Sequence, residues 1–109
     1  MKIINKKLIS VYESDIVDGK FINKTVTEVG DDCFYNMPSL RAVSLPKVTA
    51  IGSRNFRHNA ALTSVSVPLL AQCGDGNFSH NAALTSVSVP LLAQCGDGNF
   101  SDNAALTSV

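Results

Sequence analysis

Apolar side chains recur every 22 residues over most of the chain. Leucine occupies positions 40, 62, 84 and 106, and phenylalanine occupies positions 34, 56, 78 and 100. Residues 59–79 and 81–101 are identical, and the histidine at position 80 becomes an aspartate at position 102. The copies before residue 59 keep the apolar positions and change the polar ones. A fixed period of this length is the signature of a repeat architecture in which each unit forms one coil.

Each repeat also contains a local two-residue period. Val65 and Val67 alternate with Ser64 and Ser66, which predicts a short strand with one buried face. Pro68 ends this strand, because proline has no N–H to donate to a ladder. The glycines at positions 74 and 76 predict a tight turn. The segment before the next strand is too short for a long helix, so we expect a turn or one turn of 3₁₀ helix.

One coil cannot bury its own apolar side, whereas stacked coils can. Equivalent strands would lie about 4.8 Å apart in a parallel sheet, and the asparagines at positions 59, 81 and 103 would bond the backbone of neighbouring coils. The predicted fold class is an α/β-type repeat protein, mostly β: a solenoid of about four coils with short parallel strands. The predicted inward side chains of one coil are Leu62, Val65, Val67, Leu70, Cys73 and Phe78.

The first 21 residues do not follow the period and are predicted to cap the solenoid. KKLISVY is typical of a strand, and residues 16–22 are typical of a hairpin, because Asp18-Gly19 suits a two-residue type I′ turn. A β-hairpin here would cover the apolar end of the first coil. The predicted organisation is a cap over 1–21 and a solenoid over 22–109. The solenoid divides into diverged coils 22–58, identical coils 59–80 and 81–102, and a partial coil 103–109.

The partial coil leads to a prediction about assembly. It begins a strand, and nothing after it covers the last core layer, so an apolar end and a strand edge are expected to recruit a second copy. We therefore expect a homo-oligomer, a dimer formed through the C-terminal end. The expected interface consists of Leu106, Thr107, Ser108, Val109, Phe100 and Cys95.

Composition and charge exclude several classes of protein. All nine lysines and arginines lie within residues 1–58 with six acidic residues, a net charge of +3, and residues 59–109 carry three acidic residues, a net charge of −3. The sequence has no basic patch with interleaved aromatic residues, so nucleic-acid binding is not expected. No apolar run reaches the roughly 18 residues of a membrane helix. The N-terminus lacks the apolar core of an intact signal peptide.

Each candidate for chemistry has a simpler structural explanation. Cys73 with His80 could be a nucleophile pair, but Cys73 replaces an isoleucine at a core position. Cys73 and Cys95 are stacked neighbours for which a disulfide is conceivable. Asp75 and its copy Asp97 could share a calcium ion, although a glycine-flanked tight turn is favoured. The histidines at 58 and 80 with the aspartate at 102 could hold a weak transition metal. We predict no catalytic residue, no cofactor and no metal.

The pattern resembles that of a known family. LPKVTAIGSRNFRHNAALTSV (45–65) and VTEVGDDCFYNMPSLRAVSLP (26–46) are similar to the BspA-like leucine-rich repeat, with Pro, Ile-Gly, Phe and Leu in phase. The resemblance covers about residues 22–109. The alanine before the family's phenylalanine is Cys33 in the first copy and asparagine in the others, and Ile-Gly becomes Cys-Gly in the identical copies. The resemblance implies a leucine-rich-repeat solenoid, and for a natural parent it implies a microbial surface protein that binds host or matrix proteins.

These observations favour a non-enzymatic function. The identical copies fit either a recent gene amplification or an engineered array, so the favoured hypothesis is a designed or idealised scaffold that folds and self-associates through its C-terminal end. The alternative is a fragment of a microbial cell-surface adhesion protein. A protein ligand could also bind the sheet face lined by Thr63, Ser64 and Ser66 and their copies. The localisation is undetermined, although the natural parent is expected to be extracellular or on the cell surface.

Overall fold

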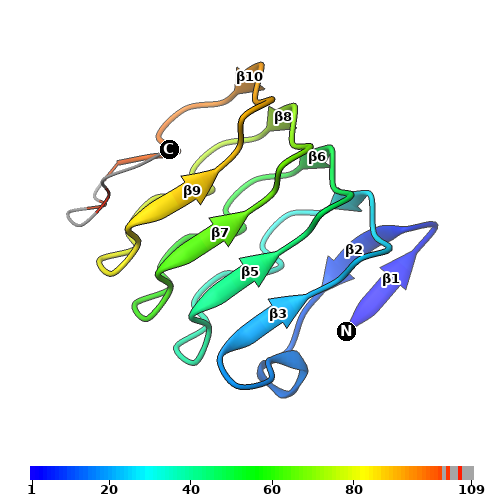
Figure 1. Ribbon diagram of the computed structural model, residues 1–109, viewed down its shortest axis with the longest axis horizontal. Helices are drawn as coiled ribbons and strands as arrows, with labels where there is room; N and C mark the ends of the chain where they lie inside the picture. The colour runs from blue at the N-terminus through cyan, green and yellow to red at the C-terminus, as the bar shows by residue number, and fades with distance from the viewer. Residues whose placement is uncertain (102, 104–105, 107–109) are drawn as a thin grey trace.

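The protein is a solenoid whose coils stack side by side along one axis (Figure 1). The computed structural model describes residues 1–101, 103 and 106, and its principal extents are 35 × 31 × 18 Å. Each coil contributes one strand to each of two sheets. The predicted mostly-β repeat solenoid is therefore confirmed. In the described part of the chain the helical content is one 3₁₀ turn, η1 (Glu13–Asp15).

The first sheet, called sheet B, is formed by the strands that the alternating pattern predicted. Its order is β3-β5-β7-β9, with all neighbours parallel and offset by one repeat. The central residue of each strand is buried and its neighbours point outward, as a two-residue period requires. The four strands are β3 (Lys20–Ile22), β5 (Ala42–Ser44), β7 (Ser64–Ser66) and β9 (Ser86–Ser88).

The second sheet, called sheet A, was not predicted, because its solenoid strands are only two residues long. In the middle coils the second strand residue is buried, as at Val29, Ile51 and Cys73, and that single apolar position is too weak a signal to define a strand. The sheet order is β1-β2-β4-β6-β8-β10. Its strands are β1 (Lys2–Ile4), β2 (Lys7–Ser10), β4 (Glu28–Val29), β6 (Ala50–Ile51), β8 (Gln72–Cys73) and β10 (Gln94–Cys95).

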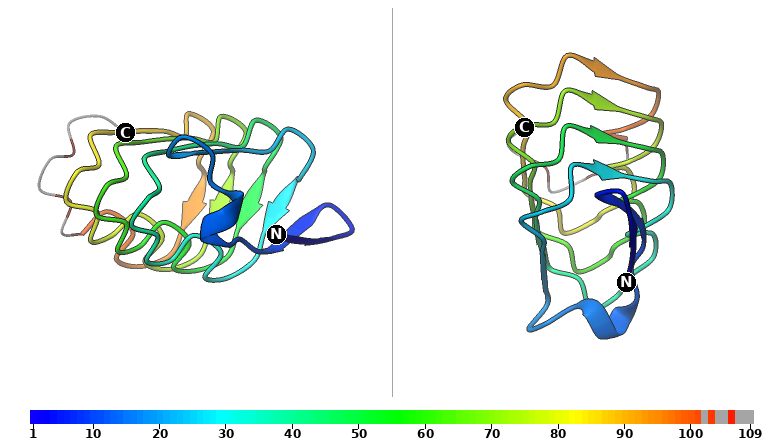
Figure 2. Two further views of the ribbon diagram at one scale, coloured as in Figure 1. Left: turned by 90° about the horizontal axis from the view of Figure 1, so that it is seen from below. Right: turned by 90° about the vertical axis from the view of Figure 1, so that its right-hand side faces the viewer.

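The N-terminal hairpin lies earlier in the chain than predicted. β1 and β2 form it around Asn5 and Lys6, whose φ angles of 49° and 63° suit a type I′ turn. β2 then pairs with β4, so the hairpin extends sheet A at one end of the stack (Figure 2). The strand predicted in KKLISVY is confirmed as β2.

The hairpin predicted over residues 16–22 is reduced to a turn. Asp18 and Gly19 have the expected positive φ angles, but the flanking residues form a single bridge between Val17 and Lys20. The chain then enters sheet B as β3, because Phe21 is buried in the core and its strand pairs in parallel with β5. β3 thus begins at Lys20, and the boundary between cap and solenoid at residue 21 stays a prediction.

The core consists of ladders of like residues. Phe34, Phe56, Phe78 and Phe100 stack with ring centroids 5.1, 5.3 and 5.3 Å apart. The leucines at 40, 62 and 84 are fully buried. The close approach of coils also needs glycine, because a Cβ at Gly74 would lie 2.9 Å from the carbonyl oxygen of Gly52. These ladders confirm the predicted inward set.

Two ladders of buried asparagines join the coils. In the predicted ladder, the Asn81 side-chain oxygen accepts the Asn59 N–H at 2.8 Å, and its side-chain amide donates to the Phe56 carbonyl. A second ladder was missed: the side-chain oxygen of Asn77 accepts the Asn55 N–H at 3.0 Å. The signal for it is an asparagine immediately before each of the last three phenylalanines. Both ladders satisfy backbone N–H groups that would otherwise be buried unpaired.

Candidate functional site

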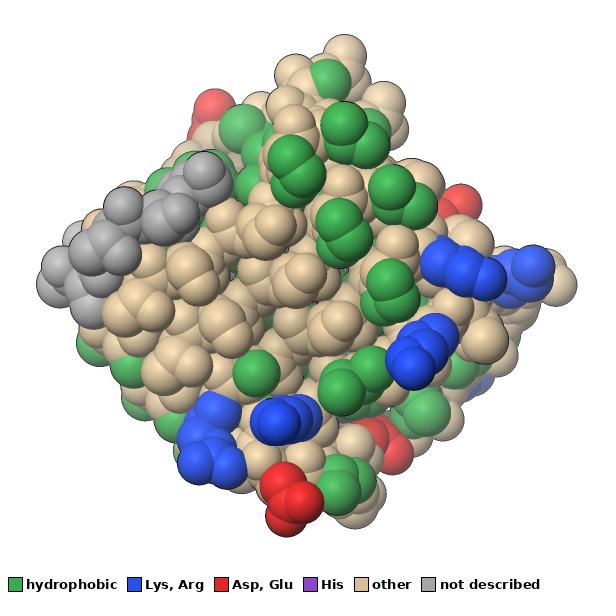
Figure 3. Space-filling model, viewed as in Figure 1, with side chains coloured by type: hydrophobic (Ala, Val, Ile, Leu, Met, Phe, Trp, Pro, Cys, Tyr) green, Lys and Arg blue, Asp and Glu red, His purple; other side chains and the backbone are tan. Residues whose placement is uncertain are grey.

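The outward surface of sheet B is flat and carries mainly small side chains, most of them serines. We call it the serine face. The alternation in each strand places two side chains per coil on this surface, so the repeat builds two parallel rows. Figure 3 shows a largely polar centre flanked by apolar side chains. The outward serines are at positions 44, 64, 66, 86 and 88. Within the described residues their hydroxyls form no hydrogen bond, so they are available to a partner. The rows consist of Lys20, Ala42, Ser64 and Ser86, and of Ile22, Ser44, Ser66 and Ser88.

A shallow groove crosses the serine face near the cap. Its volume is about 250 Å³, and it runs over β3, β5 and β7. Ile22 is 57% exposed beside it, although it is a large apolar side chain. Together with Ala42 in the groove, it offers a partner a small apolar contact. The lining residues are Lys20, Ile22, Ala42, Val43, Ser44, Ser64 and Ser66.

Positive charge collects at the cap side of the serine face. Of four exposed cations, Lys20 begins β3 and Arg41 directly precedes β5, and Lys24 and Lys47 follow the ends of these strands by two and three residues. We call these four the basic margin, and Figure 3 shows lysine and arginine side chains along this edge of the face. The Arg41 guanidinium is held there, because its Nη2 donates to the Asp18 carbonyl at 2.7 Å.

Two of the three acidic side chains near the margin are engaged elsewhere. Asp15 pairs with the N-terminal amine at 2.9 Å, which together with the Tyr12 N–H holds its carboxyl pKa below the ordinary value. Glu13 accepts a hydrogen bond from Ser39. Over residues 1–101, 103 and 106 the two ion pairs are Met1–Asp15 and Arg54–Asp32, and neither involves the basic margin. Asp18 stands exposed two residues before Lys20, and Glu13 keeps its charge, because the Ser39 hydroxyl is neutral. The four cations outnumber these two acidic groups, so the margin keeps a net positive charge.

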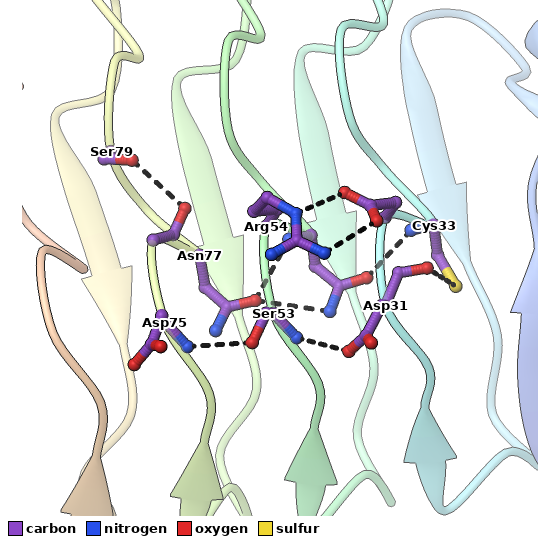
Figure 4. A network of polar contacts seen from close by, with 10 residues as sticks. Asp31, Cys33, Ser53, Arg54, Asp75, Asn77 and Ser79 are labelled. Carbon is purple, nitrogen blue, oxygen red and sulfur yellow. Dashed lines mark hydrogen bonds and ion pairs between the residues drawn. The ribbon is translucent and has the colours of Figure 1, made fainter.

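A second hollow, of about 270 Å³, lies at the turns that follow sheet A. Its charged groups form contacts between neighbouring coils. Arg54 pairs with Asp32 at 3.0 Å (Figure 4), and the Asp75 carboxylate accepts the Asp97 N–H at 2.8 Å. Two arginines and two aspartates of its lining also balance in charge, so this hollow is not favoured as a site. Its lining residues are Arg54, Arg57, Asp75, Gly76, Ser79, His80, Asp97, Gly98 and Ser101.

The aspartates considered for calcium take part in this ladder of turns. Ser53 N–H donates to the Asp31 carboxylate at 2.7 Å, and Asp75 N–H donates to the Ser53 hydroxyl at 3.0 Å. Figure 4 shows these contacts running from coil to coil. Among the described residues, no group of three or more His, Cys, Asp or Glu side chains is placed to hold a metal ion. The geometry of Asp75 and Asp97 thus fits the tight-turn interpretation.

The cysteines differ in exposure. Cys33 and Cys73 are buried, and burial is the main reason that the pKa of each thiol is raised to about 11. A nucleophile needs the thiolate, which such a pKa disfavours at neutral pH. Cys73 therefore fits a core position better than a nucleophile paired with His80. Cys95 is directly in register with Cys73 on the neighbouring strand, and it is exposed.

The two histidines stack at one corner of the solenoid. The rings of His58 and His80 lie 4.6 Å apart and nearly parallel, and both residues have positive φ angles of 58°. Loss of solvation lowers the pKa of His58, and the positive charges of His80 and Arg57 lower it further. Asp102, the third residue considered for a metal, lies outside the described residues.

The residues predicted for self-association are partly described. Phe100 is half-buried at the end of the phenylalanine stack, Leu106 packs against the core, and Cys95 is exposed. Thr107, Ser108 and Val109 lie outside the described residues. The structure brings the three described side chains to the same end of the solenoid, at the coil that follows β9.

Comparison with known proteins identifies the repeat. A family model described as the BspA type leucine rich repeat region matches residues 11–109 in six copies. No curated protein and no solved structure matches the chain. In the described part of the chain, no helix is long and apolar enough to cross a membrane.

Proposed function

The chain belongs to the BspA-type leucine-rich repeat family, and from this premise we propose that it is a non-enzymatic scaffold that binds another protein through the serine face. One observation carries the proposal: sheet B presents a flat surface of small side chains whose hydroxyls are available. A protein partner can approach the backbone closely over such a surface. In a natural parent, this function would take the form of adhesion to a host or matrix protein.

The shape of the face supports binding by complementarity over several coils. Four parallel strands hold the rows at a constant spacing, so a partner meets a rigid surface that needs little reordering. The groove and the exposed Ile22 add apolar contact at one side. Leu69 and Leu91, which follow β7 and β9, are also exposed and add apolar surface at the ends of the strands.

The test is to select peptides that bind the chain and then to block the face. Ser64→Arg combined with Ser86→Arg places two bulky charges in one row of the serine face. The matched control is Gln72→Arg with Gln94→Arg, which adds the same charges to exposed positions of sheet A. We expect the selected peptides to bind the blocked face about tenfold more weakly, or worse, and to bind the control as they bind the parent chain. Equal binding to the blocked face would refute the proposal.

A second candidate function is self-association through the last described coil. Both residues of β10 are exposed, whereas the equivalent Cys73 in β8 is buried. Within the described residues, β10 has a hydrogen-bonded neighbour, β8, on one side only, and an open strand edge favours pairing between copies. This candidate keeps the predicted interface of Cys95, Phe100 and residues 106–109.

Light scattering on a sizing column tests this second candidate. We expect a defined dimer whose population rises with protein concentration. Cys95→Arg should return the chain to monomer, because it adds bulk and charge at the open edge. Gln72→Arg, at an exposed position of the preceding strand of the same sheet, should leave the dimer intact. A monomer at every concentration would exclude this candidate.

A further inference from the structure

We propose that the cap side of the serine face binds an acidic, extended peptide segment that carries an aliphatic side chain. This inference rests on the proposed function and adds the chemistry of the partner. The contact residues are the basic margin together with Ile22 and Ala42 of the groove. The glutamates or aspartates of the peptide would pair with the margin, and its aliphatic side chain would lie in the groove.

Charge complementarity is the first argument. The basic margin consists of four exposed cations on or beside two neighbouring strands, and none of them forms an ion pair among the described residues. Among the nearby carboxylates of the cap, Asp15 pairs with the N-terminal amine, whereas Glu13 and the exposed Asp18 keep their charges. Four cations outnumber these two carboxylates, so an incoming carboxylate would meet a net positive charge, which speeds association and selects acidic partners.

The groove supplies the second argument. Lys20 is the only charged residue of its lining, and the remaining residues are small or apolar. Ile22 stands exposed at its side, so an aliphatic side chain placed there removes apolar surface of both partners from water. A cation next to an apolar groove is suited to a segment in which acidic and aliphatic residues are neighbours.

The same features favour a peptide over other polyanions. Nucleic-acid sites combine basic residues with aromatic side chains on which bases stack. In the described residues the groove contains no aromatic ring on its surface, and the exposed side chain beside it is aliphatic. Four cations at the edge of an otherwise neutral face also give a short basic patch rather than a track for a long polyanion.

The experiment measures binding of short fluorescent peptides by anisotropy. The first probe is an extended peptide with a leucine flanked by glutamates. Two matched probes replace either the glutamates by glutamines or the leucine by alanine. We expect the first probe to bind most tightly, each matched probe to bind about three- to tenfold more weakly, and the affinity of the acidic probes to fall with added salt.

Charge-reversal variants locate the site. Lys20→Glu with Lys47→Glu should weaken binding of the first probe about three- to tenfold. The control, Lys2→Glu with Lys7→Glu, makes the same change in net charge on exposed residues of the cap hairpin in sheet A and should leave binding within about twofold. Circular dichroism of both variants checks that each is folded.

Several outcomes would overturn the inference. It fails if the glutamine probe binds as tightly as the glutamate probe, if the alanine probe does so, or if both charge-reversal pairs weaken binding equally. It also fails if a single-stranded oligonucleotide binds more tightly than the acidic peptide. If the peptides selected for binding to the parent chain depend on the serine face but are not acidic, the proposed function stands and this inference alone is wrong.

Discussion

Replacing Phe56 with alanine is expected to lower the free energy of unfolding by about 3–5 kcal/mol. Phe56 is fully buried and lies inside the phenylalanine stack, with ring centroids 5.1 Å from Phe34 and 5.3 Å from Phe78. Its removal would leave a cavity between two coils whose backbones are held by strand pairing on both sides. The cavity could not collapse without separating those strands, so the loss should lie toward the upper end of the range.

Urea unfolding followed by far-ultraviolet circular dichroism measures this loss. Phe100→Ala is the matched control, because it removes the same ring from the half-buried end of the stack. We expect the control to cost clearly less than Phe56→Ala. Equal losses would mean that the ladder does not act as a continuous core and that each ring contributes through its own coil only.

The repeat period predicted the solenoid because each coil buries the same positions. Leu62 and Val65 recur in phase with their copies, and stacking of like on like is the arrangement that buries all copies at once. Sheet A was missed for a physical reason. A strand such as β8 has one buried residue, Cys73, and owes its conformation to pairing with β6 and β10 rather than to its own sequence.

The N-terminal cap shows the same limit of local reasoning. The turn at Asp18-Gly19 was predicted from residue type, yet the strand after it pairs with β5 because Phe21 is needed in the core. The Asn5-Lys6 turn of the true hairpin lacks a glycine, so its sequence is a weak signal. Tertiary contacts decided which of the two turns became a hairpin.

The candidate site was only half predictable. The alternation of Ser64 and Ser66 around an apolar valine predicts that the serine face points outward, and the structure agrees. The basic margin could not be assembled from sequence, because Lys20 and Lys47 are far apart in the chain. Parallel pairing of β3 with β5 brings their strands together. The pairing of Asp15 with the N-terminal amine, which neutralises one acidic group near the margin, has no sequence signal either.

Replacing Asn81 with leucine is expected to lower the free energy of unfolding by about 2–6 kcal/mol. Asn81 is fully buried, accepts the Asn59 N–H at 2.8 Å and donates to the Phe56 carbonyl. Leucine has the same number and branching of side-chain heavy atoms as asparagine, so the change leaves no cavity but orphans two buried backbone groups. Each orphaned group costs about 1–3 kcal/mol, because neither can reach water.

The matched control for this prediction is Gln72→Leu. Gln72 also belongs to an amide ladder, since its side-chain nitrogen donates to the Gln94 side-chain oxygen at 3.2 Å, but this ladder is exposed. Water can replace the lost bond there, so the control should change stability by no more than about 0.5 kcal/mol. If both variants lose the same stability in urea unfolding, the asparagine ladder contributes no more than a surface contact. A large loss confined to Asn81→Leu would instead mean that buried amides hold the coils in register. Only a polar side chain at this position can form the two hydrogen bonds that tie one coil to the next.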